Sequence, residues 1–393
     1  MPIDFQFTSD ELAFQAQMRA FLDQALSPEA RRKHLDYTDQ NWVDEELETE
    51  VRKGLSATGL LGASWPREYG GKGKKGAYNS LASYEMARAN APGHYHGVRI
   101  IGPSLMLFGS DEQKRFFLPK IARGEIDFSL GYSEPGAGSD LAALQTRAVA
   151  DGDDYVITGQ KIFTSGAHRA DYCWMVARTN PDVPRHKGIS IFLVPFKTPG
   201  ITIRPLYTIA GWRHNEVFFD SVRVPKSTLV GERDRGWYHL MTALDFERSG
   251  FLYQGGAQRL FDALAASCKT ATRNGKPLAE DPGVRQKLAA LRIDLDAGMR
   301  LCKRVAWMQA RGESPTTESS VSKIWCTELM QRICHVGTQI MGLYGGLMPG
   351  SPHAAAEGVL AFGYLDTVRT TIAAGSNEVQ RNIIAQRGLG MPR

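Results

Sequence analysis

The chain has 393 residues, of which 42% are hydrophobic and 23% charged, and a formal net charge of +5. This length is large for one core, so the composition indicates a globular protein of two or three domains. The small charge and the scattered basic residues argue against a nucleic-acid partner or a membrane-surface partner. No window approaches the roughly 18 consecutive apolar residues that a membrane helix needs.

The five cysteines are odd in number and form no C-x-x-C pair, and the N-terminus is acidic and polar. Such a start lacks the features of a secretory signal, and unpaired cysteines are typical of reduced thiols. We therefore expect a cytoplasmic protein. Neither the cysteines nor the nine dispersed histidines have the spacing of metal ligands, so we expect no metal site.

Residues 1–125 have helical periodicity. Thr8 and Glu11 have the spacing of a capping box, and apolar residues from Phe14 to Ala25 then share one helical face. The stretches NSLASYEMARA and DEQKRFFLPKIARGE continue in the same way. The sequence predicts an N-terminal α-helical domain.

The period changes near residue 126. Short runs rich in β-branched and aromatic residues, such as DYCWMVART, GISIFLVPF and EVFFDSVRVP, alternate there with Gly and Pro. TRAVADGDDYVITGQKIF contains two further short strands around an acidic turn. These runs predict a mostly antiparallel β-sandwich or barrel-like domain over residues 126–234.

Helical periodicity returns after GERDRGW and continues to the end. A long helix is expected from Trp237 onward. Asp281 before Pro282 is an N-cap followed by proline at the first helical position, and Ser376 can cap a last helix. The order of helices, sheet and helices predicts an α+β fold with a C-terminal helical bundle over residues 235–393.

The stretch GYSEPGAGSD, residues 131–140, follows an apolar run. Small residues allow backbone N–H groups to approach a ligand, and serine hydroxyls add donors without bulk. The same residue types dominate ordinary turns. Taken alone, the stretch favours an ordinary turn.

Four stretches together resemble the acyl-CoA dehydrogenases in their order and spacing: GYSEPGAGSD, GQKIFTSGA, NEVFFDSVRVP and AAGSNEVQRNIIAQRGLG. The resemblance covers essentially the whole chain, and the ordered set is far more specific than any one stretch. It implies FAD held between the middle sheet and the C-terminal helices, with the acyl thioester beside the flavin ring.

The resemblance also implies site residues. Leu130 to Ser139 would run along the flavin, the Ser165 hydroxyl would meet flavin N5, and Phe163 would face the ring where the family usually has Trp. Spacing alone makes Phe163 an ordinary core aromatic of a strand. The FAD contacts implied are Leu130, Tyr132, Ser133, Gly138, Ser139, Phe163, Thr164, Ser165, Arg273, Gln339, Gly342, Ser376 and Glu378.

In much of the family a glutamate before a Gly-Ser/Thr pair removes the substrate α-proton, and here that position is Ala374. A subset of the family has its glutamate on the long helix after the sheet, where this chain has Glu247. The two positions together predict Glu247 as the base, although a solvated helix glutamate is the usual alternative. The backbone N–H of Ala374 can still bind the thioester oxygen. The substrate contacts implied are Ser139, Asp245, Arg248, Ala374 and Gly375.

The chain departs from the family in one place. The family's R-x-x-F-G stretch, through which a neighbouring subunit reaches FAD, is Ala271 to Gly275 here, with Arg273 two residues late and no phenylalanine. Gln339 matches the other cross-subunit contact. This departure argues against four equivalent flavins in a homotetramer. We expect a homotetramer or a dimer, and the alternative is a heterotetramer with a second acyl-CoA dehydrogenase subunit. The combination resembles dehydrogenases of sterol side chains or other bulky acyl groups.

His94, His96 and Arg99 lie where family members line the acyl cavity, and they are equally well explained as surface residues.

The function implied is FAD-dependent α,β-dehydrogenation of an acyl-CoA to the trans-2-enoyl-CoA, with electrons passed to an electron-transferring flavoprotein. The alternatives are a catalytically silent or flavin-sharing subunit, a flavin oxidase or monooxygenase on the same fold, and a DNA-associated relative. A DNA-associated relative needs a strongly basic C-terminal surface, and the tail AQRGLGMPR is too short to supply one.

Overall fold

A computed structural model describes residues 5–27, 30, 45–93, 95–247 and 250–392, without the side chains of residues 243–247. The chain divides into two compact units, each built from separate stretches of sequence. The helical unit comprises Met1–Val51, Lys74–Gly93 and Arg248–Arg393. The sheet unit comprises Arg52–Gly73 and His94–Glu247.

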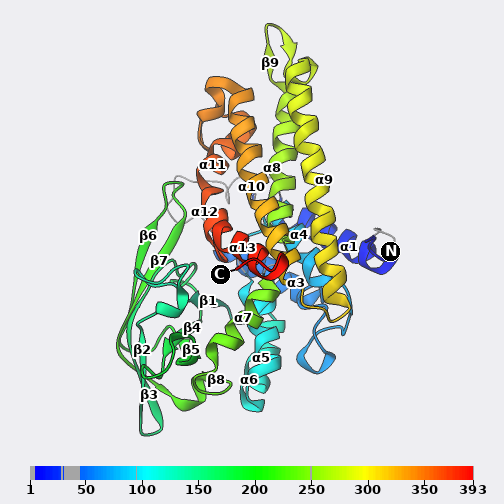
Figure 1. Cartoon of the computed structure of the whole chain (residues 1–393). Coiled ribbons are helices and arrows are strands. Elements are labelled where there is room, and N and C mark those ends of the chain that lie inside the picture. The colour runs from blue at the N-terminus through cyan, green and yellow to red at the C-terminus, as the bar shows by residue number, and fades with distance from the viewer. Residues whose placement is uncertain (1–4, 28–29, 31–44, 94, 248–249, 393) are drawn as a thin grey trace. The chain divides into compact units, whose positions relative to one another are not determined.

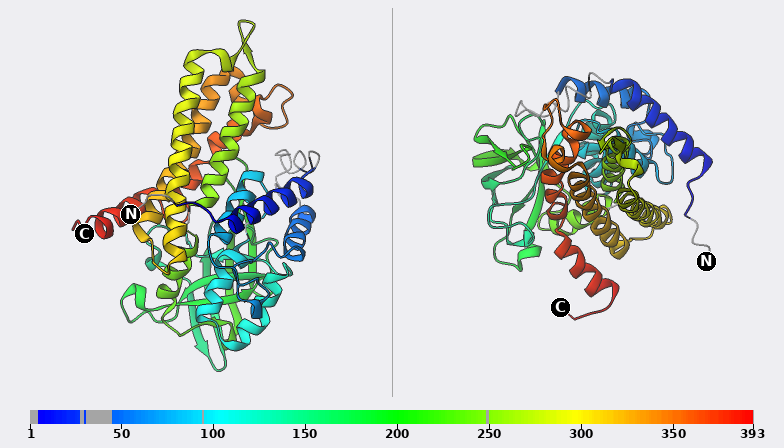
Figure 2. Two further views of the ribbon diagram at one scale, coloured as in Figure 1. Left: turned by 90° about the vertical axis from the view of Figure 1, so that its right-hand side faces the viewer. Right: turned by 90° about the horizontal axis from the view of Figure 1, so that it is seen from above.

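Three long helices dominate the helical unit: α8 (Phe251–Thr270), α9 (Pro282–Ala310) and α10 (Thr316–Met341). They run side by side in Figures 1 and 2, and Leu264, Leu295 and Ile333 belong to the core that they share. Shorter helices complete the unit: α1 (Ser9–Ala25), α4 (Tyr78–Ala89), α11 (Val359–Asp366), α12 (Val368–Ile372) and α13 (Asn377–Ile383). Helix α3 (Glu45–Ala57) begins in this unit and ends in the other.

The helix caps confirm three predictions from sequence. The Glu11 N–H donates to Thr8 Oγ1 at 3.3 Å while the Thr8 N–H donates to Glu11 Oε2 at 2.8 Å, so the capping box is formed. Asp281 accepts the N–H groups of Gly283 and Val284 at the start of α9. Ser376 caps α13 by accepting the Val379 N–H at 3.3 Å.

The sheet unit contains an eight-stranded sheet in the order β6-β7-β3-β2-β4-β5-β8, with β1 paired to β4 (Figure 1). Only the pairs β1–β4 and β2–β4 are parallel. The strands are β1 (Phe128–Gly131), β2 (Arg147–Asp151), β3 (Asp154–Lys161), β4 (Tyr172–Arg178), β5 (Ile189–Pro195), β6 (Ile201–Tyr207), β7 (Arg213–Pro225) and β8 (Leu229–Val230). The mostly antiparallel middle sheet and the α+β class are therefore as predicted.

Helices of the sheet unit flank these strands in sequence. They are the π-helical turn η2 (Gly97–Ile101), α5 (Gly102–Phe108), α6 (Asp111–Ala122) and α7 (Gly236–Glu247). Helices α5 and α7 pack against each other, and α7 contacts β5. Alternate residues of the central strands, among them Cys173, Phe192 and Val217, form the buried core.

Two features differ from the sequence analysis or were missed by it. The long helix expected from Trp237 is interrupted, because α7 ends at Glu247 and Gly250 precedes α8 with a left-handed φ of +77°. A Cβ on Gly250 would lie 2.1 Å from Ser322 Oγ, so only glycine fits there. Asn274 and Gly275, both with positive φ, turn a small hairpin between β9 (Thr272–Arg273) and β10 (Lys276–Pro277). Asn-Gly is the strongest short hairpin signal in a sequence.

All five cysteines are buried and free of disulfides. Among the described residues, no helix is both long and apolar enough to cross a membrane.

Candidate functional site

A buried ion pair anchors the loop of residues 131–140. Lys161, on β3, donates to Glu134 Oε1 at 2.8 Å and to the Tyr132 carbonyl at 3.1 Å. The Glu134 carboxylate also accepts the N–H groups of Gln145 and Thr146 at 2.6 and 3.0 Å. Both charged side chains are buried. The ion pair thus holds the loop against strand β3.

The electrostatics of this pair favour the ionised carboxylate. Burial alone raises the pKa of Glu134, but the Lys161 ammonium and the hydrogen-bond donors outweigh burial and hold it below its usual value. Burial lowers the pKa of Lys161 by more than the attraction of Glu134 raises it. Between the two pKa values both groups are charged and paired. The sequence analysis missed this pair because its members are 27 residues apart.

The top of the same loop has glycines that the chain's own packing does not explain. Glu134 and Ala137 exchange backbone hydrogen bonds, which closes a tight turn over Pro135 and Gly136. A Cβ built on Gly136 or Gly138 meets no atom within 4 Å, and neither glycine has a left-handed φ. Glycine at such positions suits the close approach of a ligand to the backbone.

A second segment, Phe163 to Ser165, follows β3 and exposes the ring of Phe163. Phe163 is 57% exposed and has a φ of +56°, a strained conformation for an aromatic residue. Thr164 is 0% exposed, and its Oγ1 has no hydrogen-bond partner within the described part of the chain. The Ser165 hydroxyl lies 2.6 Å from His214 Nδ1. Strain and an unsatisfied buried hydroxyl together make this segment a candidate for a functional one.

This segment is tied to its neighbours through the main chain. Ser129 Oγ on β1 donates to the Ser165 carbonyl at 2.6 Å, and the Ile162 N–H donates to the Ser133 carbonyl at 2.9 Å. The structure therefore brings Ser133 and Ser165, predicted as neighbours along one ligand, into the same part of the sheet unit.

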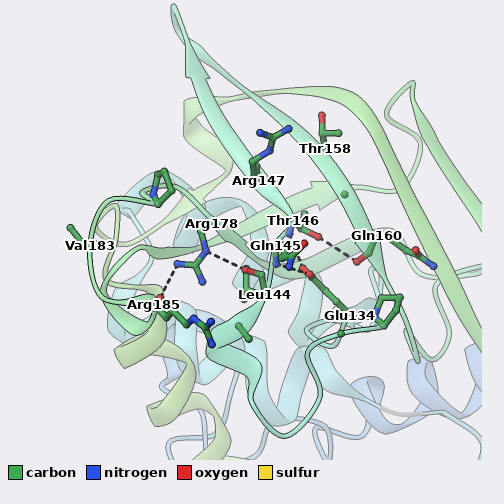
Figure 3. A pocket seen from close by; sticks show the side chains of 15 residues that line it. Glu134, Leu144, Gln145, Thr146, Arg147, Thr158, Gln160, Arg178, Val183 and Arg185 are labelled. Atoms are coloured by element: carbon green, nitrogen blue, oxygen red, sulfur yellow. Dashed lines mark hydrogen bonds between the residues drawn. The ribbon is translucent and has the colours of Figure 1, made fainter.

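An open pocket of about 840 Å³ lies beside the Glu134 loop (Figure 3). Its walls are residues 134–136, residues 143–147, residues 158–160 of β3 and the connection from β4 to β5. Arg178 shapes the wall by donating to the carbonyls of Ala142, Leu144 and Arg185. Arg147 and Arg185 also line it, so the pocket is cationic.

In the helical unit, a strained turn precedes α13. Ala374 and Gly375 have φ values of +55° and +82°. Gln380 Nε2 donates to the carbonyls of both, at 3.4 and 3.1 Å. Within the described part of the chain, no acceptor receives the N–H of Ala374. The Gln380 amide thus satisfies both carbonyl groups of the turn, and the Ala374 N–H remains available to donate to a ligand.

Buried polar side chains of α10 hold this turn. Ser320 Oγ donates to Gln380 Oε1 at 2.8 Å, and Lys323 Nζ donates to Asn377 Oδ1 at 2.8 Å. Lys323 and Gln380 are both 0% exposed, and Asn377 is 2% exposed. A buried network of this kind fixes one geometry when its members are satisfied. The sequence analysis missed it, because α10 and α13 are about 50 residues apart and only the fold joins them.

The residues predicted for the cross-subunit contact lie together at the end of α10. Arg273 Nη2 donates to the Ile340 carbonyl at 2.9 Å, next to Gln339 and close in sequence to Gly342. Gln339 is exposed and hydrogen-bonds His335 at 3.0 Å. Arg273, although two residues later than in the family pattern, therefore still contacts the end of α10 beside Gln339.

Comparison with protein-family models decides the family. The models for the N-terminal, middle and C-terminal domains of acyl-CoA dehydrogenases match residues 8–125, 129–222 and 234–389. The chain belongs to the acyl-CoA dehydrogenase family. It is therefore an enzyme of the family's FAD-dependent type.

Relatives within the acyl-CoA dehydrogenases match along nearly the whole chain. Acyl-CoA dehydrogenase FadE26 of Mycobacterium tuberculosis is 34% identical over 98% of each chain. A solved structure described as the Tcur3481-Tcur3483 steroid ACAD is 37% identical, with a TM-score of 0.91 over 99% of this chain and all of that one. The ChsE4-ChsE5 complex from Mycobacterium tuberculosis is 32% identical, with a TM-score of 0.90 over 99% of each chain.

Several residues predicted from the acyl-CoA dehydrogenase pattern lie wholly or partly outside the described residues. Glu247 is the last residue of α7, but its side chain, like that of Asp245, is not described, and Arg248 and His94 are not described at all. His96 is described: burial first, then Arg99 and Arg169, lower its pKa to about 3, so its ring is neutral. Glu378 is exposed, and its own N–H and the Ser376 hydroxyl lower its pKa.

Proposed function

We propose that the chain dehydrogenates an acyl-CoA thioester to the trans-2-enoyl-CoA, with Glu247 as the base and an electron-transferring flavoprotein as electron acceptor. The observation that carries the proposal is the turn before α13. Its N–H remains available as a donor, while Ala374 offers no carboxylate at the family's commoner base position. Glu247 closes a helix at the family's other base position.

The residues of the sheet unit suit FAD. Gly136 and Gly138 leave room for close approach of a polar chain, and Phe163 offers an exposed ring. We propose that Leu130 to Ser139, Phe163 to Ser165, Ser376 and Glu378 bind FAD. Arg273, Gln339 and Gly342 are proposed to contact the FAD of a neighbouring subunit. When bound, FAD supplies the acceptor for the β-hydrogen as hydride.

The chain's own residues provide acid–base chemistry and charge stabilisation. The Ala374 N–H donates to the thioester oxygen, which makes the α-hydrogen more acidic. A Glu247 carboxylate oxygen takes that proton and becomes a carboxylic acid. Ser139, Asp245, Arg248 and Gly375 are proposed to bind the CoA arm and the thioester.

The cationic pocket supports a CoA substrate. Arg147 lies opposite Thr158 in the register of β2 and β3, and Arg185 forms an exposed 3.4 Å pair with Asp140. Guanidinium groups are the usual partners of phosphate groups. We propose that the phosphorylated nucleotide end of CoA reaches this pocket.

The relatives support a bulky acyl group. Because the structure with a TM-score of 0.91 is described as a steroid ACAD, we propose a steroid-derived or similarly branched acyl chain. Two of the similar structures are described by paired names, which supports a second subunit of the same family as partner. A silent or flavin-sharing subunit remains the rival function, because Ala374 removes one base position.

The test is Glu247→Gln, which keeps the side chain's size and removes the basic oxygen. Flavin reduction by a steroid-type acyl-CoA, followed anaerobically by the bleaching of the flavin, is expected to fall about 10²–10⁴-fold. FAD content and acyl-CoA binding are expected to stay. Glu232→Gln, at an exposed site before α7, is the matched control and keeps the wild-type rate. A wild-type rate in Glu247→Gln would refute the base, and a wild-type protein that never bleaches would favour the silent subunit.

A further inference from the structure

His214 contacts both residues that follow β3 and are proposed to meet the flavin ring. Its Nδ1 lies 2.6 Å from the Ser165 hydroxyl. Its ring stands edge-on to the Phe163 ring, with centroids 5.9 Å apart and planes at 88°. No motif singled out in the sequence assigns a role to His214. The His214 side chain therefore contacts both Phe163 and Ser165.

The backbone fixes His214 in this place. His214 lies near the start of β7, opposite Leu206 of β6. The next residue, Asn215, is buried and clamps the other segment: the Thr164 N–H donates to the Asn215 carbonyl at 3.0 Å, and Asn215 Nδ2 donates to the Thr164 carbonyl at 2.9 Å. Because this clamp holds Thr164 against Asn215, the flanking residues Ser165 and His214 meet.

The 2.6 Å separation joins the Ser165 hydroxyl and His214 Nδ1 in a hydrogen bond, and the tautomer of the imidazole decides which atom donates. An unprotonated imidazole nitrogen is a stronger acceptor than a serine oxygen, which favours the neutral tautomer with its proton on Nε2. In this tautomer the Ser165 hydroxyl proton points toward His214, and the oxygen's lone pairs point elsewhere.

We propose that His214 is a positioning residue that turns the Ser165 hydroxyl into a hydrogen-bond acceptor toward the flavin. This inference rests on the proposed function, because it takes Ser165 to lie at the redox-active nitrogen of FAD. That nitrogen carries a hydrogen only in the reduced ring. A serine held as acceptor therefore favours the reduced ring, whereas a serine free to donate favours the oxidised ring. His214 thus raises the midpoint potential through Ser165.

The experiment measures the flavin midpoint potential of the FAD-loaded protein in four variants. His214→Phe keeps a ring beside Phe163 and removes the acceptor. The ratio of reduced to oxidised flavin at a fixed potential is expected to fall about tenfold, which for two electrons is about 30 mV. His214→Asn places an acceptor oxygen near the former Nδ1 position and is expected to restore the wild-type potential. In a Ser165→Ala background, His214→Phe is expected to change nothing further.

The control is His168→Phe, because His168 also contacts Asn215, at 3.3 Å, but not Ser165. It is expected to keep the wild-type potential. The inference is overturned if His214→Phe has the wild-type potential, or if its effect persists without the Ser165 hydroxyl. A wild-type protein that binds no FAD would instead defeat the proposed function.

A second measurement needs no cofactor. Nitrogen-15 NMR of the histidine side chains in the apoprotein, assigned with His214→Asn, is expected to show an unprotonated Nδ1 on His214. A protonated Nδ1 would overturn the inference whatever the potentials show.

Discussion

At the scale of single residues, two residues of the proposed site have a strained backbone. Phe163 and Ala374 both have left-handed φ values near +55°, each of which costs on the order of 1–3 kcal/mol. One lies in each compact unit, and each is held by buried hydrogen bonds, through Asn215 and through Gln380. Strain that the surrounding bonds maintain is common where a chain must present a group to a ligand.

The catalytic carboxylate can be moved from position 247 to position 374 by substitution. In a Glu247→Gln background, Ala374→Glu returns a carboxylate to the family's commoner place. Ala374 already has the left-handed backbone, so a larger side chain adds no new backbone strain. Flavin reduction by acyl-CoA is expected to recover by about tenfold or more over Glu247→Gln, because a positioned base contributes 10²–10⁴-fold. Stopped-flow reduction measures this. Ala374→Gln in the same background should recover nothing, and equal rates for both would contradict the pairing of the two positions.

Substitution of Gly138 in the loop should affect FAD binding without weakening the fold. In Gly138→Ala, the added Cβ meets no atom within 4 Å, and φ is not left-handed. The apoprotein is expected to be as stable as the wild type or up to about 1 kcal/mol more stable, because alanine loses less entropy on folding. FAD affinity is expected to fall at least about tenfold, because that Cβ obstructs close approach. Denaturation of the apoprotein and FAD titration measure the two effects. Unchanged affinity would make this glycine an ordinary turn residue.

At the scale of elements, the site depends on pairs that the sequence does not place side by side. The strands, the three caps and the order of helices, sheet and helices followed from periodicity and capping residues, which act within about four residues. The Lys161–Glu134 pair and the α10–α13 network join residues from 27 to about 60 positions apart. A lysine at a buried strand position was the one available signal for the first.

The break after α7 has a similar explanation. The apolar pattern from Trp237 continues through the break, so periodicity predicts one helix. Gly250 was visible in the sequence, but the reason for it comes from α10, because a Cβ at this position would lie 2.1 Å from Ser322 Oγ. A tertiary contact therefore favours glycine at position 250, directly before α8.

The buried pair between β3 and the loop sets a pH-dependent stability. Lys161→Met leaves the Glu134 carboxylate buried without its ammonium and is expected to cost about 3–5 kcal/mol at neutral pH. Glu134 has a lowered pKa, so its contribution is present above the usual value of 4.5 and is lost as pH falls through the folded-state value. The deficit of the variant should therefore shrink on acidification below 4.5.

Urea denaturation at a series of pH values measures this dependence. The double variant Lys161→Met with Glu134→Gln is the control, and it should be less destabilised than Lys161→Met alone, because no charge remains unpaired. A deficit that is independent of pH would show that the lysine acts through packing alone.

At the scale of the whole molecule, residues proposed to bind FAD and the thioester occur in both compact units. The loop and Phe163 to Ser165 belong to the sheet unit, and the turn at Ala374 and the end of α10 belong to the helical unit. The resemblance to the acyl-CoA dehydrogenases implies that a neighbouring subunit completes the FAD site. Assembly should therefore decide how much flavin the chain retains.

The end of α10 carries the assembly prediction. Directly after Gln339 and Gly342, Leu343 is 96% exposed and Tyr344 61% exposed, and Tyr364 stacks on His335 beside them. Large apolar side chains gathered beside polar ones are typical of an interface. We predict a dimer or a dimer of dimers through this surface, with the second copy or a partner subunit contacting Gln339.

Leu343→Asp places a charge on that surface, and burying an unpaired charge in an interface is costly. The variant is expected to dissociate to a smaller species by light scattering and to retain less FAD per chain than the wild type. Val149→Asp, at a 59% exposed site on β2, is the matched control and should keep both mass and FAD. If the chain alone holds less than one FAD per subunit and a co-expressed family subunit restores it, the partner is required. A Leu343→Asp protein with wild-type mass and full FAD would place the interface elsewhere.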